Sequence, residues 1–257
     1  MRTNLVKQAL KQGKLQLGTG FGQFRSPEIP KLLAAAGFQW AFLDTEHGGF
    51  DLETVQDICR VSAMVGLCPI VRVADLQYSL VARALDCGAQ GIIFPRVEQP
   101  ELLARAISWI KFPPAGVRGY GLTAVQVDYE PLKFSEIIEH MNVNSMVVLQ
   151  IETRRALEAR DELLSIPGID AVMIGPADLS ISLGVPGDFQ NPKMVEAMEQ
   201  VRDSCLKRGI APGTQTRSAS LAKFWKSRGM IFLGCSNDTG MLYERAVDLV
   251  KEIGKPD

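Results

Sequence analysis

Short apolar runs alternate with longer amphipathic segments about eight times along the chain, and no low-complexity tract or linker separates them. Each run is almost continuously apolar, which is typical of parallel strands buried on both faces. The expected strands are 15–21, 40–44, 69–73, 91–95, 146–151, 171–174, 211–214 and 230–233. The expected helices are 27–36, 51–65, 76–87, 101–110, 153–164, 192–208, 218–228 and 239–253. This repetition predicts an α/β protein with a closed (β/α)8 barrel, the TIM-barrel fold.

The ends of the expected helices carry residues that start and stop helices. Ser26, Pro27 and Glu28 open the first of them, and Gly37 follows its end. A barrel of this type uses roughly 250 residues as one domain, so the 257 residues are expected to form a single domain, 1–257. A doubly wound open sheet is the alternative. It is disfavoured because no G-x-G-x-x-G opens a helix after a strand.

Charge and cysteine content argue against several classes of protein. The 28 basic and 29 acidic residues give a net charge of -1, so no electrostatic footprint for nucleic acid or an acidic membrane is expected. The five cysteines are odd in number and show no C-x-x-C spacing, which supports neither a disulfide framework nor a zinc ribbon. No apolar run has the length of a signal peptide or a membrane span. We therefore expect a protein of the reducing cytoplasm.

Ionisable side chains stand at the carboxyl ends of otherwise apolar strands. Placing them there costs free energy unless they are paired or bind a ligand. In (β/α)8 barrels the chemistry sits at this end of the strands. Four strands deliver such groups, which predicts an active site formed by Asp44-Thr45-Glu46-His47, Arg72, Gln150 with Glu152, and Asp178.

Glu152 and Asp178 are hard oxygen ligands on neighbouring expected strands. Two carboxylates, with the remaining positions left to water and substrate, describe a site for Mg²⁺ or Mn²⁺. The alternative is structural: Asp178 would cap the following turn, and Glu152 would pair with Arg154 or Arg155. A zinc site is disfavoured because one histidine and no suitable cysteine lie nearby.

Arg72 and His47 supply charge and a proton carrier at the same end of the barrel. A guanidinium keeps its proton, so Arg72 must face an anion, either Asp44 or Glu46 or the developing enolate of a substrate. Imidazole is the natural proton carrier near neutral pH. None of the lysines falls on an expected strand or strand end, which disfavours Schiff-base chemistry and leaves metal-assisted chemistry.

Two regions fall outside this pattern. The interval between Pro95 and Met146 holds a helix, a long loop over 112–128 with a glycine-rich segment at 116–121, and a short amphipathic piece near 131–140. Loops of this length are usually functional or disordered. The polar segments 213–217 and 234–238 stand at the late strand ends, and we expect them to face part of the substrate or a subunit contact.

Six segments of the chain, taken in order, carry a resemblance to a known family. They are Asp44-Thr45-Glu46-His47-Gly48-Gly49-Phe50, Val71-Arg72-Val73, 84–91, 116–119, Gln150-Ile151-Glu152-Thr153 and 168–180. On these segments the chain resembles the HpcH/HpaI aldolase family, the metal-dependent class II pyruvate aldolases. The likeness runs from about Gly18 to Gly184 and is most specific at its end. Members act on 4-hydroxy-2-oxoheptane-1,7-dioate, 2-keto-3-deoxy-L-rhamnonate and 2-dehydro-3-deoxyglucarate.

The resemblance implies roles for the residues at the strand ends. Glu152 and Asp178 would be the protein ligands of Mg²⁺, Mn²⁺ or Co²⁺. Arg72 would donate to the 2-oxo oxygen of pyruvate and stabilise the enolate. His47, paired with Asp86, would act as acid and base.

Further residues would support the substrate and the metal. Gln150 and the backbone at Ala177 would help to hold the keto acid, and Asp44 and Glu46 would orient water around the metal. Family members are commonly hexamers, trimers of dimers that exchange a C-terminal helix, which would be 239–253 here.

The implied reaction is reversible cleavage of a 4-hydroxy-2-oxo acid, such as a 2-keto-3-deoxy sugar acid, to pyruvate and an aldehyde. Three other activities stay open: an acyl-CoA lyase of the citramalyl- or malyl-CoA type, decarboxylation of oxaloacetate as a side activity, and a non-catalytic barrel that binds keto acids. The acyl-CoA lyase is disfavoured because no basic cluster is placed to bind CoA.

Overall fold

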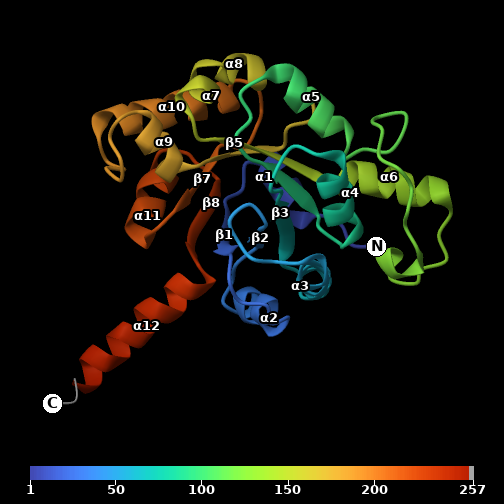
Figure 1. Ribbon diagram of the computed structural model, residues 1–257, viewed down its shortest axis with the longest axis horizontal. Coiled ribbons are helices and arrows are strands. Elements are labelled where there is room, and N and C mark those ends of the chain that lie inside the picture. The colour runs from blue at the N-terminus through green and yellow to red at the C-terminus, as the bar shows by residue number, and fades with distance from the viewer. Residues whose placement is uncertain (255–257) are drawn as a thin grey trace.

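Eight parallel strands close into one barrel, which confirms the predicted fold. In the computed structural model, which describes residues 1–254, neighbouring strands in the sequence are also neighbours in the sheet, and β8 pairs with β1. Figure 1 shows the helices around the outside of this barrel. The strands are β1 (Gln16–Phe21), β2 (Trp40–Asp44), β3 (Cys68–Arg72), β4 (Gly91–Phe94), β5 (Met146–Ile151), β6 (Ala171–Ile174), β7 (Gly213–Thr216) and β8 (Phe232–Asn237).

The helices follow the strands as predicted, with an additional helix at the amino-terminal end of the chain and further short ones inside it. Those before β5 are α1 (Leu5–Lys11), α2 (Glu28–Ala35), α3 (Leu52–Met64), α4 (Tyr78–Asp86), α5 (Pro100–Ser108), the 3-10 helix η1 (Ala124–Val127) and α6 (Phe134–Asn144). Those after it are α7 (Arg154–Glu158), α8 (Arg160–Leu163), α9 (Pro176–Ser182), α10 (Pro192–Leu206), α11 (Ala219–Ser227) and α12 (Asp238–Ile253).

The apolar core has two parts. The larger cluster fills the layer between the strands and the outer helices, and the smaller one fills the inside of the barrel around Trp40, Ile70 and Phe232. Val6 and Leu10 of α1 belong to the inner cluster. Helix α1 therefore covers the amino-terminal end of the barrel, a role that its short apolar pattern did not predict.

The register of β2 on β3 places the first charged residues of the site next to each other. Leu43 lies opposite Val71, and Asp44 lies opposite Arg72. Both strands therefore end at the same level, and their last side chains emerge at the carboxyl end of the barrel.

The late strands differ from the prediction. β7 and β8 extend to Thr216 and Asn237, past the apolar runs that predicted strands ending at 214 and 233. Their polar residues continue the ladder, with Gln215 opposite Gly234 and Thr216 opposite Cys235. Apolar periodicity misses strand residues of this kind because they face the site rather than the core.

Helix α12 extends away from the barrel, as Figure 1 shows at the lower left. Its beginning is anchored, since Asp238 accepts hydrogen bonds from the backbone N–H groups of residues 22–24. Asp238 is its only buried residue, although the helix has 16 residues. Its exposed apolar side chains are Leu242, Tyr243, Leu249, Val250 and Ile253.

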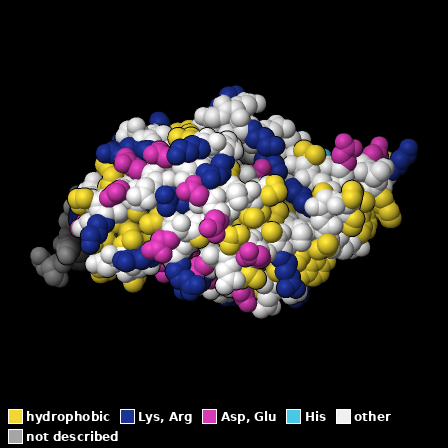
Figure 2. Space-filling model, turned by 90° about the horizontal axis from the view of Figure 1, so that it is seen from above, with side chains coloured by type: hydrophobic (Ala, Val, Ile, Leu, Met, Phe, Trp, Pro, Cys, Tyr) yellow, Lys and Arg dark blue, Asp and Glu magenta, His cyan; other side chains and the backbone are white. Residues whose placement is uncertain are grey.

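The surface carries both signs of charge. On the face that Figure 2 shows, basic and acidic side chains are interspersed rather than gathered by sign. Within residues 1–254, no helix has the length and apolar character that a membrane crossing requires.

Candidate active site

Arg72, at the end of β3, is held by two carboxylates from the end of β2. Its Nη2 lies 2.6 Å from Oδ2 of Asp44, and its Nε donates to Oδ1 of the same residue at 3.0 Å. Its Nη1 lies 3.2 Å from Oε2 of Glu46. Burial alone would raise the pKa of Asp44, but the Arg72 guanidinium lowers it below its ordinary value. The structural partners expected for Arg72 are thus both present.

Backbone contacts fix the loop that carries these groups. Asp44 Oδ1 accepts hydrogen bonds from the N–H groups of Glu46 and His47, each at 3.1 Å. Thr45 donates its hydroxyl to the carbonyl of Arg72 at 2.6 Å. The segment after β2 is therefore tied to the end of β3, which holds Asp44, Glu46 and Arg72 in one arrangement.

Glu152 is buried at the end of β5. Its Oε1 accepts a hydrogen bond from the backbone N–H of Arg96 at 3.0 Å, and its Oε2 accepts one from the Gln150 amide. Arg96 has a φ of 57°, in the left-handed region, which turns its N–H toward the carboxylate. A side chain at Gly175 would clash, since a Cβ there would lie 2.8 Å from Glu152 Oε2.

Two further carboxylates, those of Glu46 and Asp178, lie close enough to Glu152 for their charges to act on it. Burial, followed by the charges of Glu46 and Asp178, raises the pKa of Glu152 above its ordinary value. Oε2 of Glu46 is buried and, among residues 1–254, has no hydrogen-bond partner, although it lies 3.2 Å from Nη1 of Arg72. Asp178 stands in the first turn of α9, and Glu152 does not pair with Arg154 or Arg155 as the structural alternative required. A cation would relieve the repulsion among these groups.

The strand ends surround a cavity of about 590 Å³. One side of its wall contains His47, Arg72, Gln150 and 175–178, so Ala177 and Asp178 face it as expected. No lysine lines it among residues 1–254. The other side of the wall comes from β1, β7, β8 and the start of α12, with the lining residues Gly20, Gln215, Thr216, Arg217, Ser236, Asn237, Gly240 and Glu244.

His47 lies at the mouth of this cavity. Its side chain is 64% exposed, and its Nε2 lies 3.9 Å from Oε1 of Glu46. The ring is therefore free to reach a substrate from solvent, with a buried carboxylate beside it.

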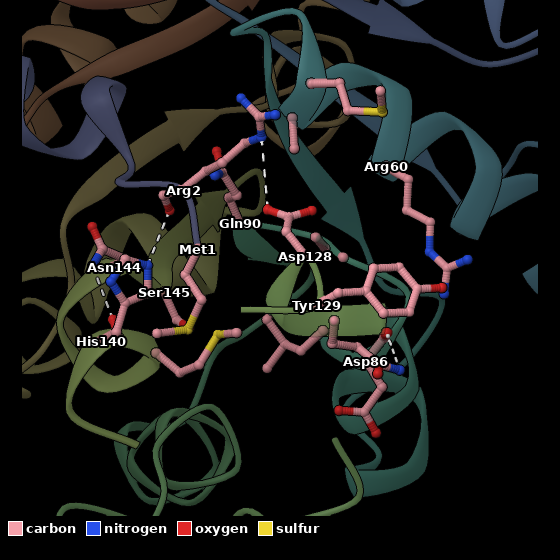
Figure 3. Close-up of a pocket in the computed structure, with 17 residues that line it drawn as sticks. Met1, Arg2, Arg60, Asp86, Gln90, Asp128, Tyr129, His140, Asn144 and Ser145 are labelled. Atoms are coloured by element: carbon pink, nitrogen blue, oxygen red, sulfur yellow. Dashed lines mark hydrogen bonds and ion pairs between the residues drawn. The ribbon is translucent and has the colours of Figure 1, made fainter. Parts of the chain in front are cut away.

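Asp86 lies at the other end of the barrel. It is the last residue of α4, which runs from the end of β3 back to the start of β4. Its Oδ1 lies 2.6 Å from Nη2 of Arg118. Figure 3 shows Asp86 beside a second cavity of about 230 Å³, together with Met1, Arg60 and Tyr129. The predicted pairing with His47 is therefore wrong within one chain, because the length of the strands separates the two residues.

Sequence reasoning gives no role to the backbone of Arg96. Its N–H binds Glu152 through backbone conformation, for which the residue type gives no signal. The sequence predicts that the polar segments 213–217 and 234–238 face part of the substrate or a subunit contact, and Arg217 and Ser236 of these segments do line the cavity. The sequence does not show which of their side chains reach it.

The fold and this group of residues define a (β/α)8-barrel enzyme with an acidic site at the strand ends. The family HpcH/HpaI aldolase/citrate lyase matches residues 21–238. The chain belongs to this family and is a carbon–carbon lyase, a class II aldolase.

Individual relatives agree with this assignment. The 4-hydroxy-2-oxo-heptane-1,7-dioate aldolase of Escherichia coli is 32% identical over 251 residues, which cover 98% of this chain and 95% of that protein. The enzyme of the same name from Salmonella typhimurium is 33% identical over 254 residues, with the same coverage. The crystal structure of an HpcH/HpaI aldolase from Desulfitobacterium hafniense has a TM-score of 0.93 and 30% identity, covering 98% of this chain and 97% of that one.

Proposed function

We propose that this aldolase cleaves 4-hydroxy-2-oxo acids, such as 4-hydroxy-2-oxoheptane-1,7-dioate or a 2-keto-3-deoxy sugar acid, to pyruvate and an aldehyde. The observation that carries the proposal is that Arg72 and Asp178 line one cavity that lacks a lysine among residues 1–254, with Glu152 buried directly behind the Gln150 of its wall. Without an amine to form an imine, the electron pair released by cleavage must be stabilised by charge. The names of the relatives support this substrate class.

Glu152 and Asp178 are the residues that we propose as ligands of a divalent metal, Mg²⁺, Mn²⁺ or Co²⁺. Enzymes of this family generally depend on such a metal. Within residues 1–254, no three His, Cys, Asp or Glu side chains form a metal-binding group, so the protein would supply two ligands. The raised pKa of Glu152 and the unpartnered oxygen of Glu46 fit a bound cation. When bound, the metal would supply Lewis-acid stabilisation of negative charge.

Arg72 would stabilise the negative charge that develops during cleavage, and His47 would transfer the proton. A base removes the proton of the C4 hydroxyl, the C3–C4 bond breaks, and its electron pair moves into the enolate of pyruvate, whose C3 then takes up a proton. Arg72 is placed to donate to the oxygen that gains charge, because Asp44 and Glu46 fix its guanidinium. His47 is the proton carrier, with Glu46 beside it. Gln150 and the backbone at Ala177 would hold the keto acid.

Asp86 has a place in this scheme only if a second copy of the chain supplies it, since its own barrel separates it from His47. We therefore propose that the protein is a homo-oligomer, with the hexamer of its relatives' family as the expected state. The projecting helix α12 and its five exposed apolar side chains support this, because such a helix gains stability by packing against another subunit. The wall at 213–217 and 234–238 would face the aldehyde half of the substrate.

The experiment that tests the proposed function is a screen for pyruvate release. The purified protein with Mg²⁺ or Mn²⁺ is incubated with 2-keto-3-deoxy sugar acids, with hydroxy-oxo diacids, and with citramalyl-CoA, malyl-CoA and oxaloacetate. We expect cleavage of at least one 4-hydroxy-2-oxo acid with turnover far above that on the CoA thioesters. Cleavage of a CoA thioester alone, or binding of keto acids without turnover of any compound, would overturn the proposal.

A further inference from the structure

Arg217 is the positively charged group of the cavity wall that the proposed reaction does not use. It stands directly after β7, the neighbour of β6 in the barrel, and it lines the same cavity. The two arginines of the lining differ in their partners. Arg72 is occupied by Asp44 and Glu46, whereas Arg217 forms no ion pair with any residue in the part of the chain described here.

An aromatic contact orients the Arg217 side chain. Its guanidinium carbon lies 5.9 Å from the centre of the Phe189 ring. A guanidinium against a ring face keeps its N–H edges free, and those edges match both oxygens of a carboxylate. Arg217 therefore offers an orientated, uncompensated positive charge to whatever occupies this side of the cavity.

The wall around Arg217 is held in place by its own hydrogen bonds. Gln215 donates its amide to the carbonyl of Ser236 at 2.7 Å, and Thr216 donates its hydroxyl to the carbonyl of Gly234 at 3.0 Å. Asn237 accepts from the N–H of Gly240 at 2.7 Å. Among the described residues, Oε1 of Gln215 is buried without a hydrogen-bond partner, but it can only accept, so Arg217 is the charged donor on this side.

We propose that Arg217 determines substrate specificity by binding a carboxylate at the far end of the aldehyde half. This assignment rests on the function proposed above, in which the keto-acid half lies against Arg72 and Gln150. The carbons beyond C4 must then extend toward β7, β8 and β1. A single carboxylate fits better than a phosphate, because the cavity is lined by no lysine and by no second arginine free of an ion pair among residues 1–254.

Glu244 is the opposing charge on this side. It stands on α12, is exposed, and lines the cavity without forming an ion pair with Arg217 among the described residues. Its charge weakens the attraction for an anion and so disfavours binding of a doubly charged group more than of a carboxylate. Substitution of Glu244 by Gln should strengthen binding of anionic compounds that depend on Arg217.

The test is a binding measurement that does not require turnover. Calorimetry in the presence of Mn²⁺ compares 2-oxoheptanedioate with 2-oxoheptanoate, which lacks the far carboxylate; neither carries the C4 hydroxyl that cleavage needs. The wild type should bind the dioate about 10- to 100-fold more tightly, as expected for a hydrogen-bonded charge pair. Arg217→Met should abolish this preference and leave the affinity for 2-oxoheptanoate unchanged.

Two companion variants separate a specific contact from general electrostatics. Arg217→Lys keeps the charge without the planar fork, so it should retain only part of the preference. Arg154→Met removes an exposed arginine that does not line the cavity, and it should retain the full preference. A wild-type protein without the preference, or Arg217→Met that keeps it, would overturn the assignment.

A second measurement distinguishes failure of the Arg217 assignment from failure of the proposed aldolase activity. Aldol addition of pyruvate to succinic semialdehyde is compared with addition to butanal and to glyceraldehyde 3-phosphate. In Arg217→Met, we expect kcat/KM for succinic semialdehyde to fall about 10- to 100-fold while butanal is unaffected. A stronger effect on glyceraldehyde 3-phosphate than on succinic semialdehyde would overturn the choice of carboxylate. Absence of addition to every aldehyde would contradict the proposed function but not the binding result.

Discussion

Arg72 and Asp44 form a two-point contact between neighbouring strands, with Nη2 2.6 Å from Oδ2 and Nε 3.0 Å from Oδ1. The register that sets these residues opposite each other extends back along β2 and β3. Arg72 is thereby held in one orientation before any substrate binds. Donors that are preorganised in this way lower the activation free energy without the cost of reorienting during the reaction.

The first prediction concerns this guanidinium. Arg72→Lys keeps the charge but loses the planar fork, and we expect turnover to fall roughly 100-fold or more, as for loss of an oxyanion donor. Because Arg72 would stabilise the enolate, exchange of the methyl protons of pyruvate in D₂O, followed by NMR, should fall as well. Unchanged exchange in Arg72→Ala would remove Arg72 from this role.

The second prediction concerns Asp178 and the crowding of carboxylates. Asp178→Asn removes one negative charge beside Glu152, so the metal-free protein should become more stable. A gain of about 1 kcal/mol corresponds to a melting temperature about 2–4 °C higher for a chain of this size. The same variant should lose the stabilisation that Mn²⁺ gives the wild type.

Thermal unfolding with EDTA and with Mn²⁺ checks both parts of the Asp178 prediction. Glu196→Gln, at a position remote from the strand ends on α10, is the control for loss of one carboxylate and should behave as the wild type. Full Mn²⁺ stabilisation in Asp178→Asn would contradict its role as a ligand.

The third prediction tests whether His47 acts at the C4 hydroxyl rather than in formation of the enolate. His47→Ala should reduce cleavage more than it reduces proton exchange of pyruvate, because Arg72 still supports the enolate while the C4 hydroxyl loses its proton carrier. Steady-state kinetics of cleavage and NMR of exchange give the two rates. Equal losses in both would assign His47 to enolate formation instead.

Asp86→Asn provides the companion measurement for His47. If Asp86 serves the His47 of another subunit, each single variant is impaired, but oligomers assembled from both variants contain some sites with both native residues. About a quarter of randomly mixed sites would be intact, so co-expression should restore activity above that of either variant. Activity no higher than that of the two variants measured separately would show that Asp86 acts only through Arg118.

The strand ends show how far the sequence predicts this site. The polar and charged residues at the strand ends are predictable as site residues, because a polar or charged group after an apolar strand costs free energy unless it is paired or binds a ligand. They are Asp44, Arg72, Gln150, Glu152 and Asp178. The barrel fold then brings the ends of such strands together. The same reasoning could not place Asp86. It ends a helix, and the resemblance assigned it a partner without saying which subunit supplies it.

The remaining misses share a physical cause. Helix α1 is short and covers the barrel with two buried apolar residues, Val6 and Leu10, too few for a periodic pattern. The polar extensions of β7 and β8 continue the pairing of the two strands, and Thr216 is buried there with its hydroxyl bonded to the carbonyl of Gly234. The periodicity of apolar residues indicates which elements pack against the core. It therefore cannot predict elements that are formed by backbone pairing or that face the site.

The fourth prediction concerns stability rather than catalysis. Burial, with the nearby charge of Lys7 next in importance, lowers the pKa of Lys111 from 10.5 to about 8. Between these values the unfolded chain keeps a proton that the folded protein has lost, so folding stability gains as pH rises from about 8 to 10.5. Relative to Lys111→Met, the free energy of unfolding of the wild type should rise over this window, by at most about 3 kcal/mol.

Urea unfolding at several pH values measures this difference. Lys251→Met, at an exposed position on α12, serves as the matched control and should follow the wild type. A difference between wild type and Lys111→Met that stays constant from pH 8 to 10.5 would contradict the lowered pKa.

The most direct test of the central claim is cleavage with and without metal, followed by trapping. With a 4-hydroxy-2-oxo acid that the enzyme cleaves, EDTA should abolish pyruvate release, and Mg²⁺, Mn²⁺ or Co²⁺ should restore it, because Asp178 but no lysine of residues 1–254 lines the cavity, and Glu152 lies close enough to Asp178 for its pKa to respond to that charge. Borohydride added with pyruvate should leave the mass of the protein unchanged. Cleavage that survives EDTA, together with a pyruvyl adduct trapped on a lysine, would contradict the account.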